Sequence, residues 1–251
     1  MMYYDPIKKG EYVEKHVCRD NGDSVSRKYY RFRGGSWYGG IASGDVIGCN
    51  LACKFCWAWR FRDRYDLGEY FSPKEAYMRL KRIAVRKGYK LLRLTGGEPT
   101  LCVDHLLSLI DLSLRDNYRF IVETNGLLIG SRPWIAEELA KREGVIVRVS
   151  FKGVSSSEFA ELTGAIPDGF GLQLKGIKNL LSAGLRPCSE IIPAIMVSFS
   201  DDRDIATFVA ELADLDPALA SCIDWEVVIL YPHVERFLRR YGLKPKRFVR
   251  P

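Results

Sequence analysis

The sequence predicts an α/β protein whose core is a partial (β/α)6 TIM-like barrel with parallel strands. After residue 40, short apolar segments alternate with segments whose apolar residues recur at helical spacing. Six strands occur in this alternation, and each is mostly apolar, as expected for a parallel sheet covered on both faces. Because six units are fewer than the eight of a closed barrel, we expect the barrel to be open.

The individual elements follow from local signals. The predicted strands lie within residues 45–48, 89–95, 119–126, 145–153, 186–197 and 222–233. Ser72 and Glu75 form a capping box before the first helix of the core, with Pro73 at its first position. Further helices are predicted near residues 103–114, 132–142, 156–163 and 171–183, and after residue 200. Ser131 and Ser200 are expected to cap two of them.

The chain divides into three predicted segments. Residues 1–40 are expected to form an irregular or β-rich cap, residues 41–238 the core, and residues 239–251 a basic tail. The tail carries most of the net charge of +7, through Arg239, Arg240, Lys244, Lys246, Arg247 and Arg250. It is either a solvated terminus or an arm that docks to an acidic partner or a phosphate backbone.

Composition excludes several classes of protein. No apolar run reaches the roughly 18 residues that a membrane span needs. The N-terminus has no apolar signal-peptide core, so we expect a cytoplasmic protein. Seven cysteines in a reducing compartment then favour metal binding or catalysis over a disulfide framework. One glutamine and five asparagines, against abundant charged residues, indicate a thermophile.

Three cysteines lie in the loop that leaves the first core strand, where parallel α/β folds place their chemistry. Cys49, Cys53 and Cys56 have the spacing CxxxCxxC. Thiolates select zinc or iron–sulfur clusters, but a closed zinc site needs a fourth ligand. Three ligands on a four-iron cluster would leave one iron open.

With Phe55 as an aromatic residue before the last cysteine, this motif resembles that of the radical S-adenosylmethionine superfamily. The resemblance implies a 4Fe-4S cluster on Cys49, Cys53 and Cys56, which are both metal ligands and catalytic. Its open iron would chelate S-adenosylmethionine. One-electron reduction would then give methionine and a 5′-deoxyadenosyl radical that abstracts hydrogen, with the protein positioning the cofactor.

The segment "TGGEP" follows the second strand and is similar to the family turn that holds the amino group of S-adenosylmethionine. The resemblance makes Gly96, Gly97, Glu98 and Pro99 cofactor-binding residues. Glu98 would add charge or hold the turn.

Other segments resemble the pyruvate formate-lyase activating enzymes, over roughly residues 45–242. "ETNG" after the third strand implies cofactor contacts from Glu123 and Asn125. "SFK" implies contacts from Ser150 and Lys152, although Ser150 replaces an acidic residue. "EFAELTGA", residues 158–165, is similar to a segment ending in Glu-Leu-Thr-Gly. "VVILYPH" places His233 near the cofactor, with its Pro-Tyr order inverted.

Two further features allow alternatives. The stretch "WAWRFRDRY" could shield the cluster with Trp57 and Trp59, or bind single-stranded RNA through them and its arginines. The other cysteines lack the spacing of a second cluster. Cys102 and Cys188 are expected in the core, and Cys222 could serve as a hydrogen-atom donor.

The sequence therefore predicts an oxygen-sensitive radical S-adenosylmethionine enzyme that receives electrons from ferredoxin or flavodoxin. A protein or peptide substrate, as in the activating enzymes, is the first hypothesis. A tRNA substrate is the second, and a non-catalytic electron carrier the third. An amine-binding turn argues against a carrier, which has no use for one.

Overall fold

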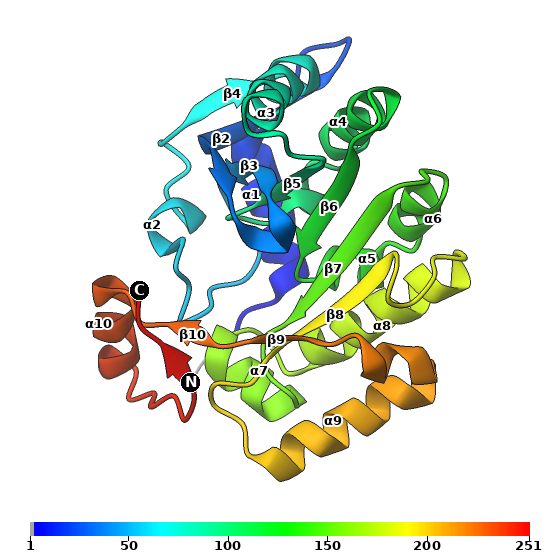
Figure 1. Ribbon diagram of the computed structural model, residues 1–251. Coiled ribbons are helices and arrows are strands. Elements are labelled where there is room, and N and C mark those ends of the chain that lie inside the picture. The colour runs from blue at the N-terminus through cyan, green and yellow to red at the C-terminus, as the bar shows by residue number, and fades with distance from the viewer. Residues whose placement is uncertain (1–2) are drawn as a thin grey trace.

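The six predicted strands form one parallel sheet that curves without closing into a barrel. The computed structural model describes residues 3–251 (Figure 1). The parallel strands are β3 (Ile41–Val46), β5 (Leu91–Thr95), β6 (Arg119–Thr124), β7 (Val145–Phe151), β8 (Ile191–Met196) and β9 (Asp224–Glu226). In the described chain the sheet order runs from β1 to β9 without returning, so the barrel is open, as predicted.

The sixth predicted strand is split in two. After β9 the chain leaves the sheet, and β10 (Val228–Ile229) pairs instead with β11 (Phe248–Val249). The Val228 N–H donates to the Ser198 hydroxyl at 2.7 Å, which marks the change of partner.

Of the two forms predicted for residues 1–40, irregular or β-rich, the described residues 3–40 are closer to the β-rich one, and their strands extend the sheet. They contain helix α1 (Pro6–Val17), which the sequence did not reveal, and strands β1 (Cys18–Asp20) and β2 (Val25–Gly35). β2 is antiparallel to β3 and also pairs with β4 (Glu69–Phe71). A bulge interrupts the β2–β3 register between Tyr29 and Arg31.

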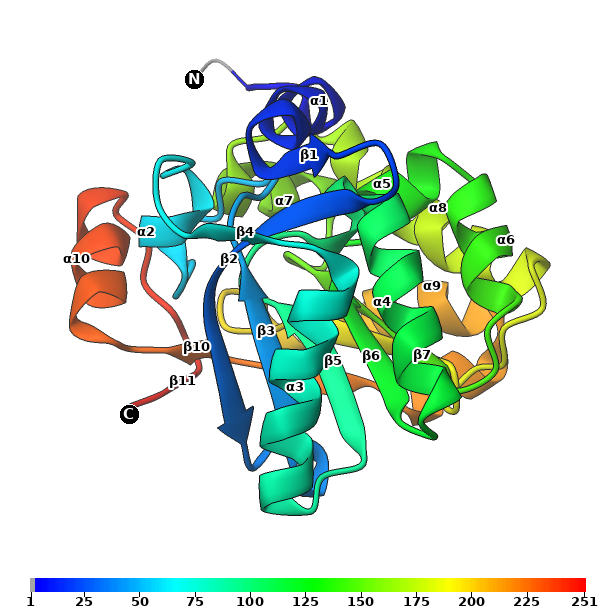
Figure 2. The ribbon, with the colours of Figure 1, turned by 90° about the horizontal axis from the view of Figure 1, so that it is seen from above.

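Helices line the outer face of the sheet, while α2 (Trp59–Arg62) and α10 (Pro232–Arg240) lie together at one side, next to the cysteine loop (Figures 1 and 2). The other helices are α1, α3 (Pro73–Lys87), α4 (Val103–Arg115), α5 (Leu127–Ser131), α6 (Trp134–Ala140), α7 (Ser156–Thr163), α8 (Asp168–Ser182) and α9 (Asp202–Leu215). Short 3-10 turns are η1 (Trp37–Gly39), η2 (Pro99–Leu101) and η3 (Pro217–Ser221).

Local helix signals were partly right. Ser72 and Glu75 make both bonds of the capping box of α3. The caps predicted at Ser131 and Ser200 are wrong. Ser131 is the last residue of α5, and Ser200 donates its hydroxyl to Glu158 while Asp201 precedes α9. In both places the serine hydroxyl donates to another group, the Leu128 carbonyl for Ser131 and the Glu158 carboxylate for Ser200, and does not accept from a helix N-terminus.

The basic tail is folded against the body and is not a free arm. β11 pairs with β10, and the Lys246 N–H donates to the Ser198 carbonyl at 2.6 Å. Lys246, Arg247 and Arg250 form ion pairs with Asp201, Asp202 and Glu235. Half of the tail's charge is therefore neutralised within the chain.

Two disulfides correct the expectation that the cysteines are not paired. Cys18 is bonded to Cys102, with Cα atoms 5.8 Å apart, and Cys188 to Cys222, with Cα atoms 5.3 Å apart. Cys188 is exposed rather than in the core, and Cys222 is not a free hydrogen-atom donor. The expectation was wrong for these four cysteines because each pair joins positions far apart in the sequence, 84 and 34 residues, which only the fold brings together.

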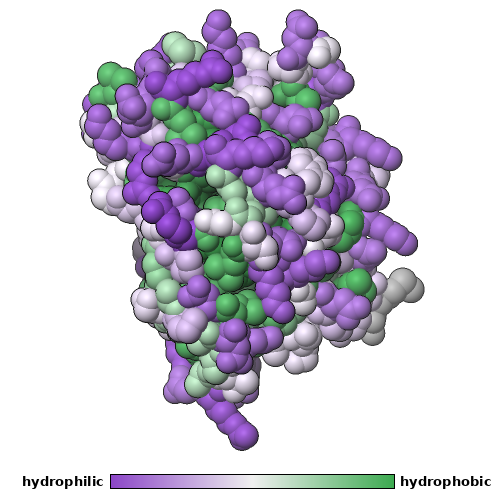
Figure 3. All heavy atoms as spheres, turned by 90° about the vertical axis from the view of Figure 1, so that its right-hand side faces the viewer, coloured by the Kyte–Doolittle hydropathy of each residue, from purple (hydrophilic) through white to green (hydrophobic). Residues whose placement is uncertain are grey.

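Hydrophilic residues cover most of the side that carries α6 and α8, around a narrower band of hydrophobic ones (Figure 3). Within residues 3–251, no helix combines the length and the apolar character that crossing a membrane requires.

Candidate active site

The loop of the three cysteines is pinned at several points. The Gly48 N–H donates to the Phe61 carbonyl at 3.2 Å, and the Lys54 N–H donates to the Leu162 carbonyl at the end of α7 at 2.9 Å. The Tyr4 hydroxyl accepts from the Ala52 N–H at 2.7 Å, and Arg62 donates to the Cys53 carbonyl at 3.0 Å. α7 comes from the segment "EFAELTGA", so this segment supports the loop directly.

The three thiols of the loop are free and partly buried. Burial raises the pKa of Cys49 to about 12 and that of Cys53 and Cys56 to about 11, although Lys9, Arg62 and Lys152 act in the opposite direction. Metal binding would therefore have to displace protons, and the three cations would balance the resulting thiolates.

The residue types of the donor set indicate which metal group it could hold. Thiolates select zinc or iron–sulfur clusters. A closed zinc site needs a fourth ligand, whereas in a cluster each thiolate binds its own iron. The donor set therefore fits a three-cysteine iron–sulfur cluster.

The turn "TGGEP" lies directly against this loop and depends on its glycines. Gly96 has φ +92°, which favours glycine. A Cβ on Gly97 would lie 2.1 Å from the Gly48 carbonyl oxygen, so only glycine permits this approach. The Glu98 N–H then donates to the same carbonyl at 2.8 Å.

Glu98 holds the turn to the end of β6. Its buried carboxylate accepts bonds from the Thr100 N–H and hydroxyl at 3.1 and 2.7 Å. It also accepts from the Thr124 hydroxyl at 2.7 Å and from the Asn125 N–H at 2.8 Å. The sequence predicts that Glu98 either adds charge to the site or holds the turn, and these contacts are the ones that hold the turn.

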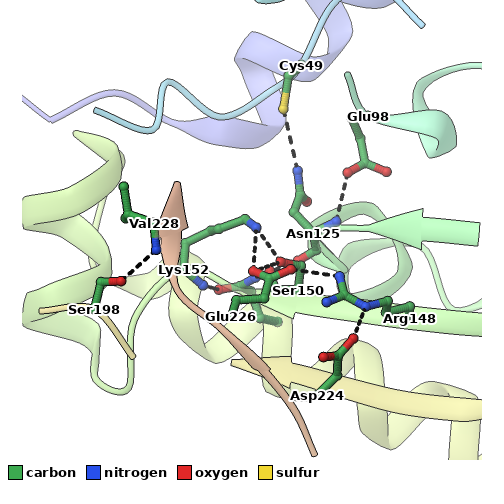
Figure 4. A network of polar contacts seen from close by, with 11 residues as sticks. Cys49, Glu98, Asn125, Arg148, Ser150, Lys152, Ser198, Asp224, Glu226 and Val228 are labelled. Atoms are coloured by element: carbon green, nitrogen blue, oxygen red, sulfur yellow. Dashed lines mark hydrogen bonds and ion pairs between the residues drawn. The ribbon is translucent and has the colours of Figure 1, made fainter. Parts of the chain in front are cut away.

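Asn125 links the third strand to the cysteine loop. Its amide donates to the Asn50 side-chain oxygen at 2.7 Å, and its nitrogen lies 3.8 Å from the Cys49 sulfur (Figure 4). Pro99 begins η2 directly after Glu98. The "CNLAC", "GGEP" and "ETNG" segments therefore form one connected cluster of contacts at the carboxyl end of the sheet.

Glu226 supplies the carboxylate that Ser150 lacks. The Ser150 hydroxyl donates to Glu226 at 2.7 Å, and Lys152 lies 3.6 Å from the same oxygen (Figure 4). Arg148 contacts Glu226 and Asp224, each at 2.7 Å. Although burial opposes it, the charges of Lys152 and Arg148 lower the pKa of Glu226 to about 2.

Glu123 of β6 lies on the same face of the sheet as Arg148 and Ser150, the face turned away from the helices, which we call the inner face. Two residues of the chain already bind its carboxylate. It accepts from Arg93 at 2.6 Å and from the Tyr38 hydroxyl at 3.2 Å. Tyr38 has φ +56°, a strained value for this residue type, in the turn before β3. One oxygen of Glu123 therefore already has two partners in the chain.

The remaining predicted residues lie on the far side of the cysteine loop. Phe55 packs against Phe199, with ring centroids 5.7 Å apart, in a hydrophobic cluster that includes Val234 and Leu238 of α10. His233 donates from Nε2 to the Trp57 carbonyl at 3.0 Å. His233 therefore contacts the backbone next to Cys56 rather than the "GGEP" turn.

The arginine-rich stretch is packed on one side and exposed on the other. Trp59 packs edge-on against Phe237 of α10, with ring centroids 4.8 Å apart, yet Trp57 and Trp59 are 40% and 36% exposed. Arg62 and Arg64 are paired with Asp63 and Asp66, and Arg60 is exposed. The contact with α10 agrees with the shielding interpretation, and the exposed side is compatible with the RNA interpretation.

Sequence reasoning missed Tyr30. Three buried polar side-chain atoms of the described residues have no hydrogen-bond partner: Arg27 Nε, the Tyr30 hydroxyl and Asn50 Nδ2. Asn50 is next to Cys49, and Arg27 donates to the Glu98 carbonyl at 3.3 Å. A Cβ on Gly96 would lie 3.0 Å from the Tyr30 hydroxyl. All three orphan atoms therefore belong to residues around the cysteine loop and "GGEP".

No local pattern marks Tyr30 in the sequence, because its direction depends on the bulge in β2. Bulges re-aim side chains and occur often beside active sites. The ring is stacked on Phe61, with centroids 3.8 Å apart.

The model of the radical SAM superfamily matches residues 46–209 of this chain. A probable GTP 3′,8-cyclase of Sulfurisphaera tokodaii is 30% identical over 139 residues, which are 55% of this chain and 42% of the relative. The chain thus spans less than half of the length of that relative.

Solved structures share the fold. Streptococcus suis SuiB bound to S-adenosylmethionine is 19% identical, with a TM-score of 0.57 over 82% of this chain and 48% of that one. TYW1 with a lysine-pyruvate adduct is 17% identical, with a TM-score of 0.53 over 90% of this chain and 82% of that one. Together with the family match, which covers most of the chain, this makes the protein an enzyme of the radical S-adenosylmethionine superfamily, with a 4Fe-4S cluster and S-adenosylmethionine as cofactors.

Proposed function

We propose that Cys49, Cys53 and Cys56 hold the cluster and that S-adenosylmethionine binds between the cysteine loop and the inner face of the sheet. The observation that carries this assignment is the gathering of all three unpartnered buried polar atoms around the cysteine loop and the "GGEP" turn. Buried polar groups are almost always paired, so orphans at one place indicate a ligand that is bound there.

Within this site the residues have different tasks. Gly96 and Gly97 let the turn lie against the cysteine loop, where its backbone would hold the cofactor, while Glu98, Pro99 and Asn125 fix the turn. The Tyr30 hydroxyl, beside Gly96, would donate a hydrogen bond to the cofactor. Lys152, held by Ser150 and Glu226, would contact the cofactor, and Glu123 would line the site on the inner face. Phe55 and His233 support the loop from behind.

When bound, the cluster and S-adenosylmethionine supply a carbon radical that abstracts a hydrogen atom from the substrate. The contribution of the chain is orientation and the exclusion of water. On one side of the loop, Phe237 of α10 packs against Trp59.

We propose a protein or peptide substrate, as in the activating enzymes. On the inner face, Arg31 and Arg33 are paired with Asp45, and Arg93 with Glu123. Arg148 and Lys152 are paired with Asp224 and Glu226. These five cations face four carboxylates, so one positive charge is left over for a triphosphate, which needs unpaired positive charge. The nearly balanced charges suit a peptide better than GTP.

A one-electron donor is required, and we propose flavodoxin or ferredoxin. Both act in the cytoplasm, where we also place this protein. The division into residues 1–40, a core of residues 41–238 and a tail of residues 239–251 stays a prediction.

Replacement of Cys53 tests the cofactor assignment. After anaerobic reconstitution, Cys53→Ala should bind little iron and sulfide and form no 5′-deoxyadenosine with dithionite as reductant. The matched control removes a cysteine pair from the other end of the sheet, with Cys188→Ala and Cys222→Ala combined. Cluster content that survives in Cys53→Ala, or vanishes equally in the control, would contradict the assignment.

The substrate is tested by stimulation of 5′-deoxyadenosine formation. Peptides and proteins encoded beside the gene should stimulate it, and a deuterated one should transfer deuterium into the product. Stimulation by GTP or by bulk tRNA, without any by peptides, would overturn the proposed substrate class and leave the cofactor assignment intact.

A further inference from the structure

Helix α10 presents an unpaired basic face directly behind the cysteine loop. Arg236, Arg239 and Arg240 are exposed and recur at the i, i+3 and i+4 spacing of one helix face, and Lys244 follows after the helix. Among residues 3–251, no carboxylate lies within ion-pair distance of these four side chains, whereas Lys246, Arg247 and Arg250 of the same tail are all paired. We call these four residues the α10 basic face.

The opposite side of the helix is fixed to the cysteine loop. Val234 and Leu238 are buried in one hydrophobic cluster with Phe55, the residue before Cys56. Phe237 packs on Trp59, and His233 donates to the carbonyl of Trp57, the residue after Cys56. Figures 1 and 2 both place α10 beside α2, which follows the loop. One helix therefore separates the α10 basic face from the thiols.

We propose that the α10 basic face is the docking surface for an acidic protein that donates one electron to this enzyme, with flavodoxin as the probe in the test below. This inference rests on the proposed function, because only a chain that takes up electrons at this loop needs such a partner. The donor gives up one electron and the bound cluster gains it, with no other group transferred.

Position and charge both support this partner. Complementary charge steers encounter and raises association rates about 10- to 1,000-fold at low ionic strength. A donor bound behind the loop also leaves the inner face of the sheet open, so that substrate and donor can bind together. An RNA would gain the same charge attraction, but no advantage from lying behind the cysteines.

The test compares two variants with the same change in net charge. The first combines Arg236→Glu, Arg239→Glu and Arg240→Glu. The matched control combines Lys74→Glu, Arg82→Glu and Arg86→Glu on the exposed face of α3, which lies away from α10 in both views. None of these six side chains is part of the proposed cofactor site.

Affinity for oxidised flavodoxin is measured by calorimetric titration at several salt concentrations, followed by the rate of cluster reduction by reduced flavodoxin. In the α10 variant we expect both to fall about tenfold or more at low salt and to lose most of their salt dependence. The α3 control should keep the affinity and the reduction rate of the unmodified enzyme. Dithionite-driven 5′-deoxyadenosine formation should be equal in the unmodified enzyme, the α10 variant and the α3 control.

Three outcomes would overturn the proposal. Flavodoxin affinity could be unchanged in the α10 variant, or it could fall equally in the α3 control, which would indicate net charge alone. Loss of tRNA affinity with unchanged flavodoxin affinity would make the α10 basic face an RNA surface. If the unmodified enzyme forms no 5′-deoxyadenosine even with dithionite, the proposed function fails instead, whatever the affinities.

Discussion

The two faces of the parallel sheet are built from opposite kinds of residue. Toward the helices, Phe120, Val147 and Phe151 are fully buried among apolar neighbours. On the inner face, the same strands carry Glu123 and Arg148. Burying charge is costly unless each group is paired, whereas burying apolar surface is favourable in itself. The outer face therefore stabilises the fold. The charged residues of the inner face are not explained by stability, so we assign them to the function of the site.

Phe120 should give the largest loss of stability. It is fully buried on the outer face, near the amino end of β6 and away from the cysteine loop. Phe120→Ala should lower the free energy of unfolding by about 3–5 kcal/mol in urea titrations. The exposed neighbour Arg119→Ala should change it by less than about 0.5 kcal/mol. Affinity of the folded protein for S-adenosylmethionine should not change. If Phe120→Ala weakened cofactor affinity without loss of stability, the claim that the outer face serves only stability would be wrong.

Glu226 makes the matching case on the inner face. Glu226→Gln keeps the shape but leaves Lys152 without its carboxylate, while Arg148 keeps Asp224. Since hydrogen bonds to charged groups contribute about 1.5–3 kcal/mol, the loss of stability should lie in that range. Unlike Phe120→Ala, this variant should also weaken binding of S-adenosylmethionine. The measurements are urea unfolding and cofactor titration, and an unchanged cofactor affinity would remove Lys152 from the proposed site.

Acid titration tests the inner face alone, because Glu226 titrates and the apolar residues of the outer face do not. The folded protein holds the pKa of Glu226 at about 2, below its ordinary value of 4.5. The unfolded chain therefore binds this proton at a higher pH, so acid favours unfolding. The contribution of Glu226 should be complete above about pH 4.5 and disappear as the pH falls toward 2. The unfolding free energy of the metal-free protein should fall less steeply in this window in Glu226→Gln, and equal slopes would contradict the ion-pair account.

The same contrast explains what the sequence could predict. Strands and helices follow from periodicity, which each segment carries by itself, so the six strands were found. The cysteine loop and "TGGEP" also could be found, because their chemistry lies in neighbouring residues. Glu226 could not, since it meets Ser150 across 76 positions and only the register of the strands brings them together. The disulfides, with separations of 84 and 34 residues, were missed for the same reason.

The smallest and sharpest test uses two neighbouring tyrosines that point to opposite faces of β2. The Tyr29 hydroxyl donates to Nε2 of His105 at 2.7 Å, in the buried layer between the sheet and α4. The Tyr30 hydroxyl is buried without a partner at Gly96. Each Tyr→Phe change removes one oxygen atom, so the two variants are matched in everything except the face that they alter.

Tyr29→Phe should cost about 1 kcal/mol of stability and leave cofactor affinity unchanged, because it breaks a bond within the fold. Tyr30→Phe should leave stability unchanged or slightly higher, because it removes an unpaired polar group. If its hydroxyl bonds to S-adenosylmethionine, the dissociation constant should rise about 2- to 10-fold. Urea unfolding and cofactor titration of both variants give four numbers. If cofactor affinity changed in Tyr29→Phe and not in Tyr30→Phe, the assignment of the two faces would be wrong. The unpaired hydroxyl of Tyr30 would then not be explained by a bound ligand.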